Sequence, residues 1–415
     1  MPDTQNSSAT DQKEQPDSKR PLEGLRVLDI ATYIASPFCA TLMAEFGAEV
    51  IKIELPGVGD ACRKLGTVDE CGDTLLWLSE ARNKKSITLD LRKPEGAAIF
   101  KKLVAISDVV TENFQPGTLE RWGIGWDVLH EINPKLVLLR VSGYGQTGPY
   151  KDKPSFGRIG NAFGGISFLA GDPDRAPATP GSATLADYLS GVFGGFGVMA
   201  ALRHAEATGI GQFIDIGLYE PIFRILDEVA PAYDRKGTIR QRMGAATVNV
   251  CPHSHYPTKD NRWVAIACTN DKIFARLANL MGQGDVANDG KYGNIQQREA
   301  ARHAVDGMVT DWTMLYDQKE VVSLCQEAQV PCGIVAAIDE IFEDPHYAAR
   351  GNIARPADDR AGGLAVPNVV PRLSETPGKI DWLGPALGQH KNEILGDLLK
   401  LSEAEIQKLE DDQVI

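Results

Sequence analysis

The sequence lacks the features that define several large classes of protein. No run of about 18 apolar residues occurs, so we expect no membrane-spanning helix. The segment from Met1 to Arg20 has no apolar stretch, so it does not resemble a secretory signal peptide. The 7 cysteines are scattered and form no CxxC pair. They predict reduced thiols in a cytoplasmic protein rather than a disulfide framework or a zinc site.

Positive charge is outweighed by negative charge. The chain has 43 Lys and Arg against 56 Asp and Glu, which gives a net charge of −13. This balance argues against a protein that binds nucleic acid or an anionic membrane over a wide surface, although it allows a local basic pocket. The 415 residues, 43% hydrophobic and 24% charged, have the composition of a globular protein. That length predicts about two or three domains.

Several familiar catalytic motifs are also missing. The sequence contains no GxxxxGK[ST], HExxH or GxSxG string, which disfavours a P-loop NTPase, a zincin or an α/β-hydrolase. GxGxxG occurs once, at Gly143 to Gly148, but Pro149 and a loop rich in Gly and Pro follow it. A dinucleotide fingerprint needs a helix at that point, so this string does not predict a dinucleotide site.

From Leu25 onward, short strand-like segments alternate with helical ones. This order predicts an α/β fold with a parallel sheet covered on both faces. Residues 1–20 are polar and predict a disordered tail. The expected strands are 25–30, 49–53, 86–90, 108–111, 136–141 and 213–216. The expected helices in this part are 37–46, 94–105, 185–204 and 220–232, with a loop or lid over 143–181.

The helix expected from Leu185 carries several glycines, which cost about 1 kcal/mol each in a helix and indicate close packing or a break. Composition then shifts over 234–257, which marks a crossing between domains. Beyond it, we expect strands at 263–267 and 333–335 and helices at 271–282, 296–315 and 318–328. A helix from Ser402, with Glu405 completing a capping box, closes the chain.

Asp187 is the first candidate for chemistry. It lies among small and apolar residues near an expected helix start. One interpretation is structural, as a cap or a first-turn partner of the helix dipole. The other is a reactive carboxylate, because a desolvated carboxylate is a stronger nucleophile and small neighbours let a large substrate approach.

Two further clusters allow structural and functional interpretations. The string Arg82 to Lys85 is either a solvated charge cluster or a phosphate-binding patch that Arg121 joins. His253 and His255 have the spacing of metal ligands, but no third ligand accompanies them. Substrate contact or a structural role is favoured for this pair over a metal site.

Six strings, taken together and in order, resemble the class III CoA-transferase family. They are Pro21–Asp29, Phe46–Glu54, Arg82–Ile87, Glu112–Gly117, Gly143–Pro149 and Leu185–Asp187. Within the family, Thr74–Lys84, Pro367–Pro371 and Leu373–Gly378 resemble the members that move CoA from succinyl-CoA to malate or citramalate. The resemblance runs from about Pro21 to the C-terminus.

The resemblance implies a fold and partners. It implies a large Rossmann-like domain made of residues 21–233 and 340–415, with a small α/β domain inserted at 234–339. Two such subunits would form an interlinked-ring homodimer. The substrates would be an acyl-CoA and a small dicarboxylic acid such as malate, citramalate, mesaconate or itaconate. No metal and no permanently bound cofactor are expected.

The resemblance also implies site residues. Asp187 matches the catalytic aspartate, which forms an acyl anhydride and then an aspartyl-CoA thioester. Lys84 and Arg121 match residues near the CoA phosphates, and Asn113 and Phe114 match residues near the CoA chain. Tyr144 matches an active-site tyrosine. In the loop after the first strand, Tyr33 and Ala35 are candidates for CoA contact and Ile34 for substrate contact.

Departures from the family pattern narrow the substrate. Thr32-Tyr33-Ile34 stands where formyl-CoA transferase has His-Val-Gln, which argues against formyl or oxalyl transfer. We expect a counter-charge for a second substrate carboxylate from one of four side chains, namely Arg158, Arg242, His253 or His255.

Three alternatives stay open. An intramolecular CoA-transferase would need the same aspartate and no external acceptor. A racemase of this family would need a histidine where this chain has Phe156. A non-catalytic CoA-binding protein would have no need of Asp187.

Overall fold

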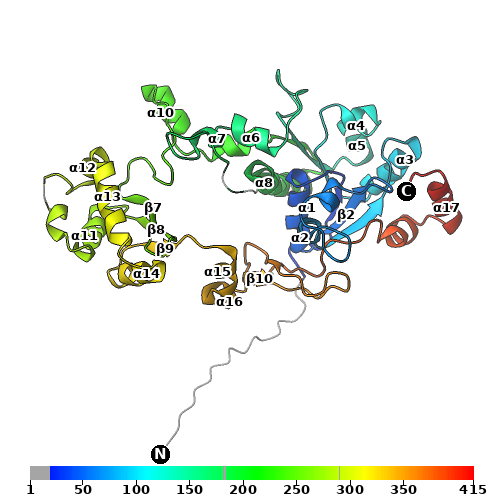
Figure 1. The fold of residues 1–415 in the computed structure, drawn as a ribbon. Helices are drawn as coiled ribbons and strands as arrows, with labels where there is room; N and C mark the ends of the chain where they lie inside the picture. Colours follow the sequence, from blue (N-terminus) through cyan, green and yellow to red (C-terminus); the bar gives the residue numbers. More distant parts are fainter. Residues whose placement is uncertain (1–18, 180, 182–183, 289) are drawn as a thin grey trace, which may run out of the picture. The chain divides into compact units, whose positions relative to one another are not determined.

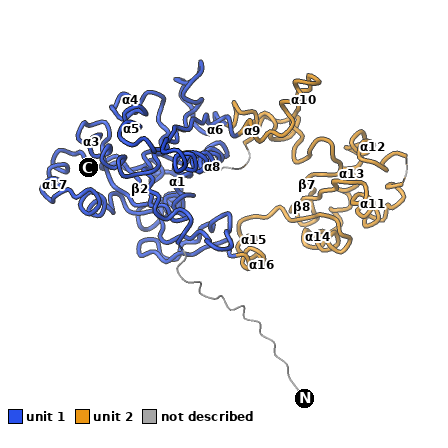
Figure 2. Tube along the Cα trace, turned by 180° about the vertical axis from the view of Figure 1, so that it is seen from behind, with its two compact units in different colours: residues 1–160, 184–221, 351–415 blue, residues 161–183, 222–350 orange. Residues whose placement is uncertain are grey.

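The computed structural model describes residues 19–179, 181, 184–288 and 290–415 and divides the chain into two compact units (Figures 1 and 2). Unit 1 comprises residues 1–160, 184–221 and 351–415, and unit 2 comprises 161–183 and 222–350. The sequence predicted an inserted domain at 234–339. The second unit in the structure includes more of the chain than that range. Most of the expected tail, residues 1–18, lies outside the described residues. Its last residue, Arg20, is part of the fold and forms an ion pair with Asp381 at 2.6 Å.

Unit 1 is built on a six-stranded parallel sheet with the strand order β3-β2-β1-β4-β5-β6. This is the strand order of the Rossmann fold, so the prediction of an α/β core with a parallel sheet is confirmed. The strands are β1 (Arg26–Asp29), β2 (Glu49–Glu54), β3 (Lys84–Thr88), β4 (Val109–Glu112), β5 (Val137–Ser142) and β6 (Phe213–Gly217).

Helices cover both faces of this sheet. On one face, α1 (Ala35–Glu45) and α8 (Leu185–Thr208) pack against each other and against the strands (Figure 1). On the other face, a core cluster joins the sheet to α3 (Pro94–Val104), α5 (Trp126–Ile132) and the C-terminal helices. These are η3 (Asn392–Leu398) and α17 (Glu403–Asp411), which begins with the predicted Ser402–Glu405 capping box. The end of the chain thus returns to the unit in which it began.

The glycines of α8 serve close packing and do not break the helix. A β-carbon at Gly191 would lie 2.9 Å from the carbonyl oxygen of Ala35 in α1, and one at Gly194 would lie 2.8 Å from Leu139 in β5. By length and composition, α8 is apolar enough to cross a membrane, with 39% of the tested window buried. The sequence contains no uninterrupted run of about 18 apolar residues, so a helix with this mean hydropathy was not expected.

The remaining elements of unit 1 are short and lie mostly in its connections. They are η1 (Ala61–Lys64), α2 (Leu75–Glu80), α4 (Thr118–Arg121) and the antiparallel pair β10 (Ile353–Ala354) and β11 (Val366–Pro367). Two helices span a boundary between the units, α6 (Gly157–Phe163) and α9 (Tyr219–Arg224). Because α6 and α7 (Ile166–Leu169) lie within 143–181, that segment is not simply the loop that the sequence predicted.

Unit 2 contains a three-stranded antiparallel sheet in the order β7-β8-β9, covered by helices. Tyr256, Phe274 and Val305 are among the residues of its own buried core. β7 was not predicted from the sequence, because its first three residues are His253, Ser254 and His255 and therefore lack the apolar alternation of a typical strand. The elements are β7 (His253–Pro257), β8 (Trp263–Ala267), β9 (Cys332–Ile334), α10 (Val229–Lys236), α11 (Asp271–Leu280), η2 (Gly284–Ala287), α12 (Ile295–Ala300), α13 (Arg302–Thr313), α14 (Gln318–Glu327), α15 (Ile338–Glu343) and α16 (Pro345–Ala349).

Candidate active site

Asp187 lies in the first turn of α8, just after Thr184, whose backbone is still extended. The Thr184 side chain hydrogen-bonds the Asp187 carboxyl group. Gly157, at the start of α6, approaches the same group. A β-carbon at position 157 would lie only 2.2 Å from Asp187 Oδ2. Glycine is therefore the residue that lets the backbone come this close to the carboxylate without displacing it.

Burial raises the pKa of Asp187 to about 6, and the Thr184 hydrogen bond opposes part of that rise. The carboxylate is thus desolvated but still largely ionised at neutral pH. A carboxylate in this state needs no neighbouring base to act as a nucleophile. Of the two interpretations of Asp187, the surroundings favour the reactive one, while its place in the first turn fits the structural one as well.

Asp187 lines a cavity of about 450 Å³ at the carboxyl edge of the sheet. The lining comes from segments at or beyond the ends of β1, β4, β5 and β6. Phe156 is part of it, and its ring packs edge to face against Tyr33 with 6.1 Å between centroids. The cavity brings together Asp187 and the predicted site residues Tyr33, Ile34, Ala35, Asn113 and Arg158.

A second cavity of about 510 Å³ lies within the same unit. It is lined by residues at or beyond the ends of β1 to β4, including the predicted Phe114. Two cations, Lys64 and Arg92, also belong to its lining. Thr32 and Tyr33 line both cavities, so the loop after β1 forms part of each.

That shared loop is held by side chains from two other segments. Asn113 accepts a hydrogen bond from the Thr32 N–H at 2.8 Å and donates one to the Thr32 carbonyl oxygen at 2.6 Å. Asp60 accepts the Tyr33 N–H at 3.0 Å. Tyr33 has a φ of 62°, a left-handed conformation that is uncommon for a residue with a side chain. These contacts offset the cost of that conformation and fix the loop between the cavities.

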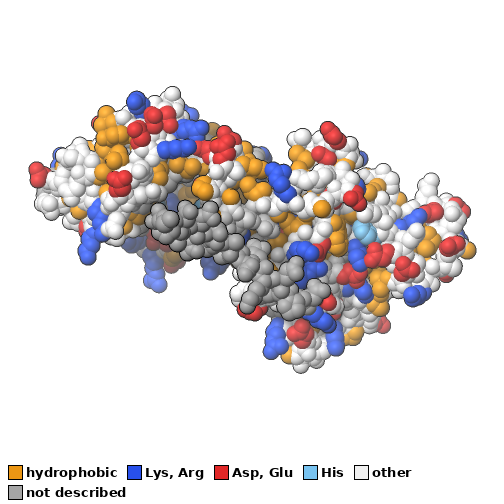
Figure 3. Space-filling model, turned by 90° about the horizontal axis from the view of Figure 1, so that it is seen from below, with side chains coloured by type: hydrophobic (Ala, Val, Ile, Leu, Met, Phe, Trp, Pro, Cys, Tyr) orange, Lys and Arg blue, Asp and Glu red, His pale blue; other side chains and the backbone are white. Residues whose placement is uncertain are grey.

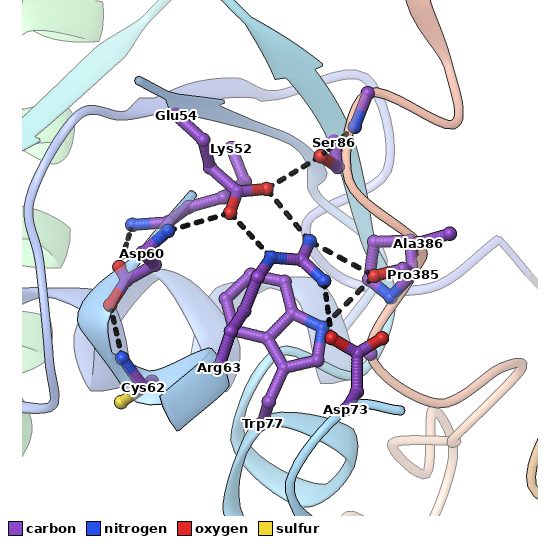
Figure 4. A network of polar contacts seen from close by, with 12 residues as sticks. Lys52, Glu54, Asp60, Cys62, Arg63, Asp73, Trp77, Ser86, Pro385 and Ala386 are labelled. Carbon is purple, nitrogen blue, oxygen red and sulfur yellow. Dashed lines mark hydrogen bonds and ion pairs between the residues drawn. The ribbon is translucent and has the colours of Figure 1, made fainter. Parts of the chain in front are cut away.

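A network of buried charges anchors Asp60 (Figure 4). Its carboxylate forms an ion pair with Lys52 at 2.8 Å, and its N–H donates to Glu54 at 2.9 Å. Arg63 then pairs with Glu54 at 2.7 Å and with Asp73 at 2.8 Å. Such buried ion pairs are costly to break, because a lone buried charge remains. The network therefore holds the segment around Asp60, which contacts the shared loop, in a fixed position.

The cationic string Arg82 to Lys85 has a role that the sequence analysis did not foresee. Each side chain has a partner within unit 1. Arg82 pairs with Glu45, the Asn83 side chain donates to the Lys379 carbonyl, Lys84 pairs with Asp29, and Lys85 pairs with Glu49 and Glu393. Lys84 is only 1% exposed and lines neither cavity. Arg82, Asn83 and Lys84 are therefore buried and paired, whereas Lys85 also lines a separate cavity of about 500 Å³.

The other predicted residues lie outside both linings. Arg121 is one residue before Trp122, which lines the 510 Å³ cavity, and its guanidinium donates to Thr118 at 2.8 Å. The ring of Tyr144 packs on Tyr150 and Tyr219. Arg242 and His255 line a separate cavity within unit 2, and His253 lies in β7.

Three further residues at these cavities, Gly157, Lys64 and Arg92, were not predicted from the sequence. Arg92 had a usable signal, because it closely follows β3 and ligands of parallel sheets bind beyond the carboxyl ends of strands. Lys64 had none, since η1 is a short turn within a long connection. Gly157 had none either, because its importance depends on the approach of α8.

The charged side chains drawn on one face of the molecule are mixed in sign (Figure 3). On the face drawn in Figure 3, Lys and Arg side chains are interspersed with Asp and Glu side chains. Electrostatic attraction of an anionic ligand would therefore depend on the local cations at the cavities, Lys64, Arg92 and Arg158.

Fold and site together define a Rossmann-like α/β protein with two adjoining cavities at the carboxyl ends of its strands and a desolvated carboxylate in one of them. The chain belongs to CoA-transferase family III, whose family model matches residues 22–391. It is therefore a transferase of this family, as the six sequence strings predicted.

Individual relatives are similar over nearly the whole chain. The beta subunit of succinyl-CoA–L-malate CoA-transferase from Chloroflexus aurantiacus is 52% identical, over 95% of this chain and 98% of that protein. Succinyl-CoA–D-citramalate CoA-transferase from the same organism is 46% identical, over 95% and 98%. Among solved structures, a CAIB/BAIF family protein from Brucella suis is 32% identical, with a TM-score of 0.82 over 92% of this chain and 100% of that one.

Proposed function

We propose that this enzyme moves CoA from succinyl-CoA to a small dicarboxylic acid such as L-malate or D-citramalate. The observation that carries the proposal is the shared lining of the two cavities by Thr32 and Tyr33, with Asp187 in one and two cations in the other. A CoA thioester is long, anionic at its nucleotide end and reactive at the opposite end, so it matches such a pair of cavities. The names of the relatives supply the donor and the acceptors.

The nucleotide of CoA would occupy the 510 Å³ cavity. Lys64 and Arg92 would face its phosphates, although Arg92 also pairs with Asp90 at 2.7 Å. Phe114 offers an apolar face for the adenine or the pantetheine chain. The chain would pass the loop of Thr32 and Tyr33, so that the thioester reaches Asp187. In this arrangement Arg92 takes the role that the resemblance implied for Lys84.

The reaction is a series of acyl transfers whose net result is that one thioester is broken and one is formed. Asp187 attacks succinyl-CoA and forms a mixed anhydride as CoA thiolate leaves. The thiolate attacks the aspartyl carbonyl, which releases succinate and leaves an aspartyl-CoA thioester. The acceptor carboxylate then attacks this thioester, and the expelled thiolate takes the acceptor acyl group from the resulting anhydride. Asp187 returns as a carboxylate, and no water or redox partner takes part.

Arg158 supplies the counter-charge for the second carboxylate of the substrate. It lines the same cavity as Asp187, and it is the one Arg or Lys among the residues of that lining. Both succinate and the acceptor acids carry a carboxylate beyond the reacting one, and a guanidinium binds a carboxylate through two parallel hydrogen bonds. Ile34 and Phe156 would border the carbon chain of the acid.

The test is CoA transfer from succinyl-CoA to a panel of L-malate, D-citramalate, mesaconate and itaconate. Wild-type protein should form the new acyl-CoA, and during turnover Asp187 should be trapped as the hydroxamate by hydroxylamine or as the alcohol by borohydride. The Asp187→Ala variant should lose transfer and trapping together. Wild-type turnover in this variant would overturn the proposal.

A second candidate is intramolecular transfer between the two carboxylates of one dicarboxylyl-CoA. The same Asp187 and Arg158 would serve it, since both carboxylates of the substrate would be bound. Isotope-labelled free acid separates the two reactions, because only intermolecular transfer incorporates it. Racemisation is disfavoured, because Phe156 offers no proton-transferring group on this cavity.

We also propose that the chain acts in the cytoplasm as the interlinked homodimer that the family resemblance implies. Apolar side chains of α8 support a partner surface, with Phe196 77% exposed and Val192 48% exposed. Light scattering should give twice the mass of 45.0 kDa. A monomer would contradict this. The alpha and beta subunits of the Chloroflexus aurantiacus malate enzyme are 50% and 52% identical to this chain, so co-expression with a related chain is the matched comparison.

A further inference from the structure

Unit 2 contains a cavity of its own, of about 590 Å³, that the proposed reaction does not use. It is lined by the loop that carries Arg242, by β7, by Trp263 at the start of β8 and by α13. Two arginines, Arg242 and Arg302, contribute to the lining together with His255. Two carboxylates, Asp172 and Asp306, face the same space. The cavity thus combines cations and hydrogen-bond acceptors around one aromatic surface.

Both arginines are held in place while part of each guanidinium stays without a partner. Nη2 of Arg302 donates to the carbonyl oxygens of Thr247 at 2.7 Å and Val250 at 2.9 Å and forms an ion pair with Glu299 at 2.9 Å. Arg242 Nη1 donates to the Phe168 carbonyl at 3.0 Å. The buried Arg302 Nη1 and Arg242 Nε have no hydrogen-bond partner among the described residues. Buried guanidinium N–H groups without acceptors are costly. Both arginines also line the cavity, where an anion can reach them.

The two carboxylates narrow the ligand class. Asp306 accepts the hydroxyl of Tyr256 at 2.6 Å, and Asp172 lies 3.6 Å from Arg175. Neither forms an ion pair with the cavity arginines among the described residues. A hydroxyl group of the ligand would find hydrogen-bond acceptors in both carboxylates. The lining therefore suits an organic acid that carries a carboxylate and a hydroxyl group.

We propose that this cavity is a binding site for a small hydroxycarboxylic acid, whose carboxylate is held by Arg242 and Arg302. The hydroxyl of the ligand donates to Asp172 or Asp306, and Trp263, which is 49% exposed, covers its carbon chain. The choice of hydroxy acid agrees with the proposed acceptors, but the site itself stands on the unit 2 residues. Binding here requires neither CoA nor Asp187.

The experiment is calorimetric titration of L-malate into the Asp187→Ala protein without CoA. Saturable binding is expected, with a tryptophan fluorescence change that disappears in Trp263→Phe. Arg242→Gln should weaken binding by about tenfold or more, because one charge-assisted contact is lost. Arg276→Gln is the charge-matched control on unit 2 outside the cavity, and its affinity should equal that of the parent. Succinate, which lacks the hydroxyl, should bind more weakly.

Several outcomes would overturn the site. Unchanged affinity in Arg242→Gln would do so, as would equal binding of inorganic phosphate. Loss of binding in Arg158→Gln instead would place the acid in the cavity of Asp187. Arg302→Gln is a second variant, and circular dichroism must show that it stays folded. Arg242→Gln is the safer variant, because Arg242 donates to only one backbone carbonyl. Since no turnover is measured, failure here is separate from failure of the proposed transfer reaction.

Discussion

The backbone N–H of Tyr33 donates a hydrogen bond to the carboxylate of Asp60 across 3.0 Å. Tyr33 borders both cavities of unit 1, and Asp60 belongs to the buried charge network. The contact therefore links the rigid interior of the sheet to the loop that a CoA chain would have to pass. Together with the Cys62 thiol, which donates to the Tyr33 carbonyl oxygen at 3.2 Å, this contact offsets the cost of the left-handed conformation of Tyr33.

Substitution of Asp60 separates positioning from stability. In Asp60→Asn, an amide oxygen can still accept the Tyr33 N–H, but Lys52 loses a buried counter-charge. In Asp60→Ala, both interactions are lost. Each variant should lose about 3 kcal/mol of unfolding free energy, because a buried ion pair is broken. Only Asp60→Ala should also raise KM for the acyl-CoA, by about tenfold. Denaturant unfolding and steady-state kinetics measure the two effects, and equal KM values for both variants would count against a positioning role.

Gly157 should be as sensitive as a catalytic group. In Gly157→Ala, the new β-carbon would meet Thr184 Cγ2 at 2.0 Å and Asp187 Oδ2 at 2.2 Å, so the carboxylate and its Thr184 partner must move. A displacement of this kind can cost about 10²-fold in rate, and we expect kcat to fall by that factor. Gly307→Ala is the matched control, because its β-carbon would meet nothing within 4 Å. Rapid-quench measurement of the first acyl transfer checks this, and an unimpaired rate would show that Asp187 does not react from the position seen here.

The sequence predicted the strands of the sheet well, but it did not predict which charged side chains would pair with one another. Alternating apolar segments have local signals, so the strands of unit 1 were predicted to within a few residues. The partners of the string Arg82 to Lys85 could not be predicted, because they lie far away in the sequence. Glu45, Asp29 and Glu393 come from three different elements. Pairing of that kind depends on the tertiary fold, which no local pattern encodes.

The cavities show the same limit from another side. Asn113 and Phe114 are neighbours in the sequence, but one lines the cavity of Asp187 and the other lines the cavity with Lys64. The resemblance placed both near CoA without separating them. Gly157 was not predicted, because glycine occurs in loops for many structural reasons. Its close approach to Asp187 is visible only once α8 is in place.

Arg158 should determine how well the acceptor acid is bound. In Arg158→Gln, the second carboxylate of the substrate loses a charged partner, so KM for L-malate should rise by about tenfold or more. A monocarboxylic acceptor has no such group, so its poor KM should stay unchanged. Arg158→Lys keeps the charge but not the paired hydrogen bonds, so its KM for L-malate should lie between those of the wild type and Arg158→Gln. Acceptor kinetics at saturating succinyl-CoA check this, and a parallel rise for both acceptor types would reject the assignment.

The pH dependence of the first half-reaction should follow Asp187. Burial raises its pKa to about 6, so kcat/KM for succinyl-CoA should fall about tenfold per pH unit below that value as the nucleophile is protonated. The phosphates of the substrate also titrate at mildly acidic pH. Thr184→Val distinguishes the sources, because it removes the hydrogen bond that lowers the pKa of Asp187. In that variant the acidic limb of the kcat/KM profile should move to higher pH. If the limb does not move, it reports titration of the substrate phosphates and not of Asp187.

The same shift makes Asp187 a cost to stability. Its folded pKa lies above the value of 3.8 for the unfolded chain, so the folded state binds the proton more tightly. Stability contributed by this group is therefore present below pH 3.8 and is lost as the pH rises through about 6. At pH 7.5, Asp187→Asn should raise the unfolding free energy by about 1 to 3 kcal/mol, since it removes a buried charge. At pH 4 the gain should be much smaller, because the wild-type carboxyl is then mostly protonated when folded. Thermal unfolding at both pH values checks the sign, and a loss of stability at pH 7.5 would mean that the carboxylate of Asp187 has a stabilising partner.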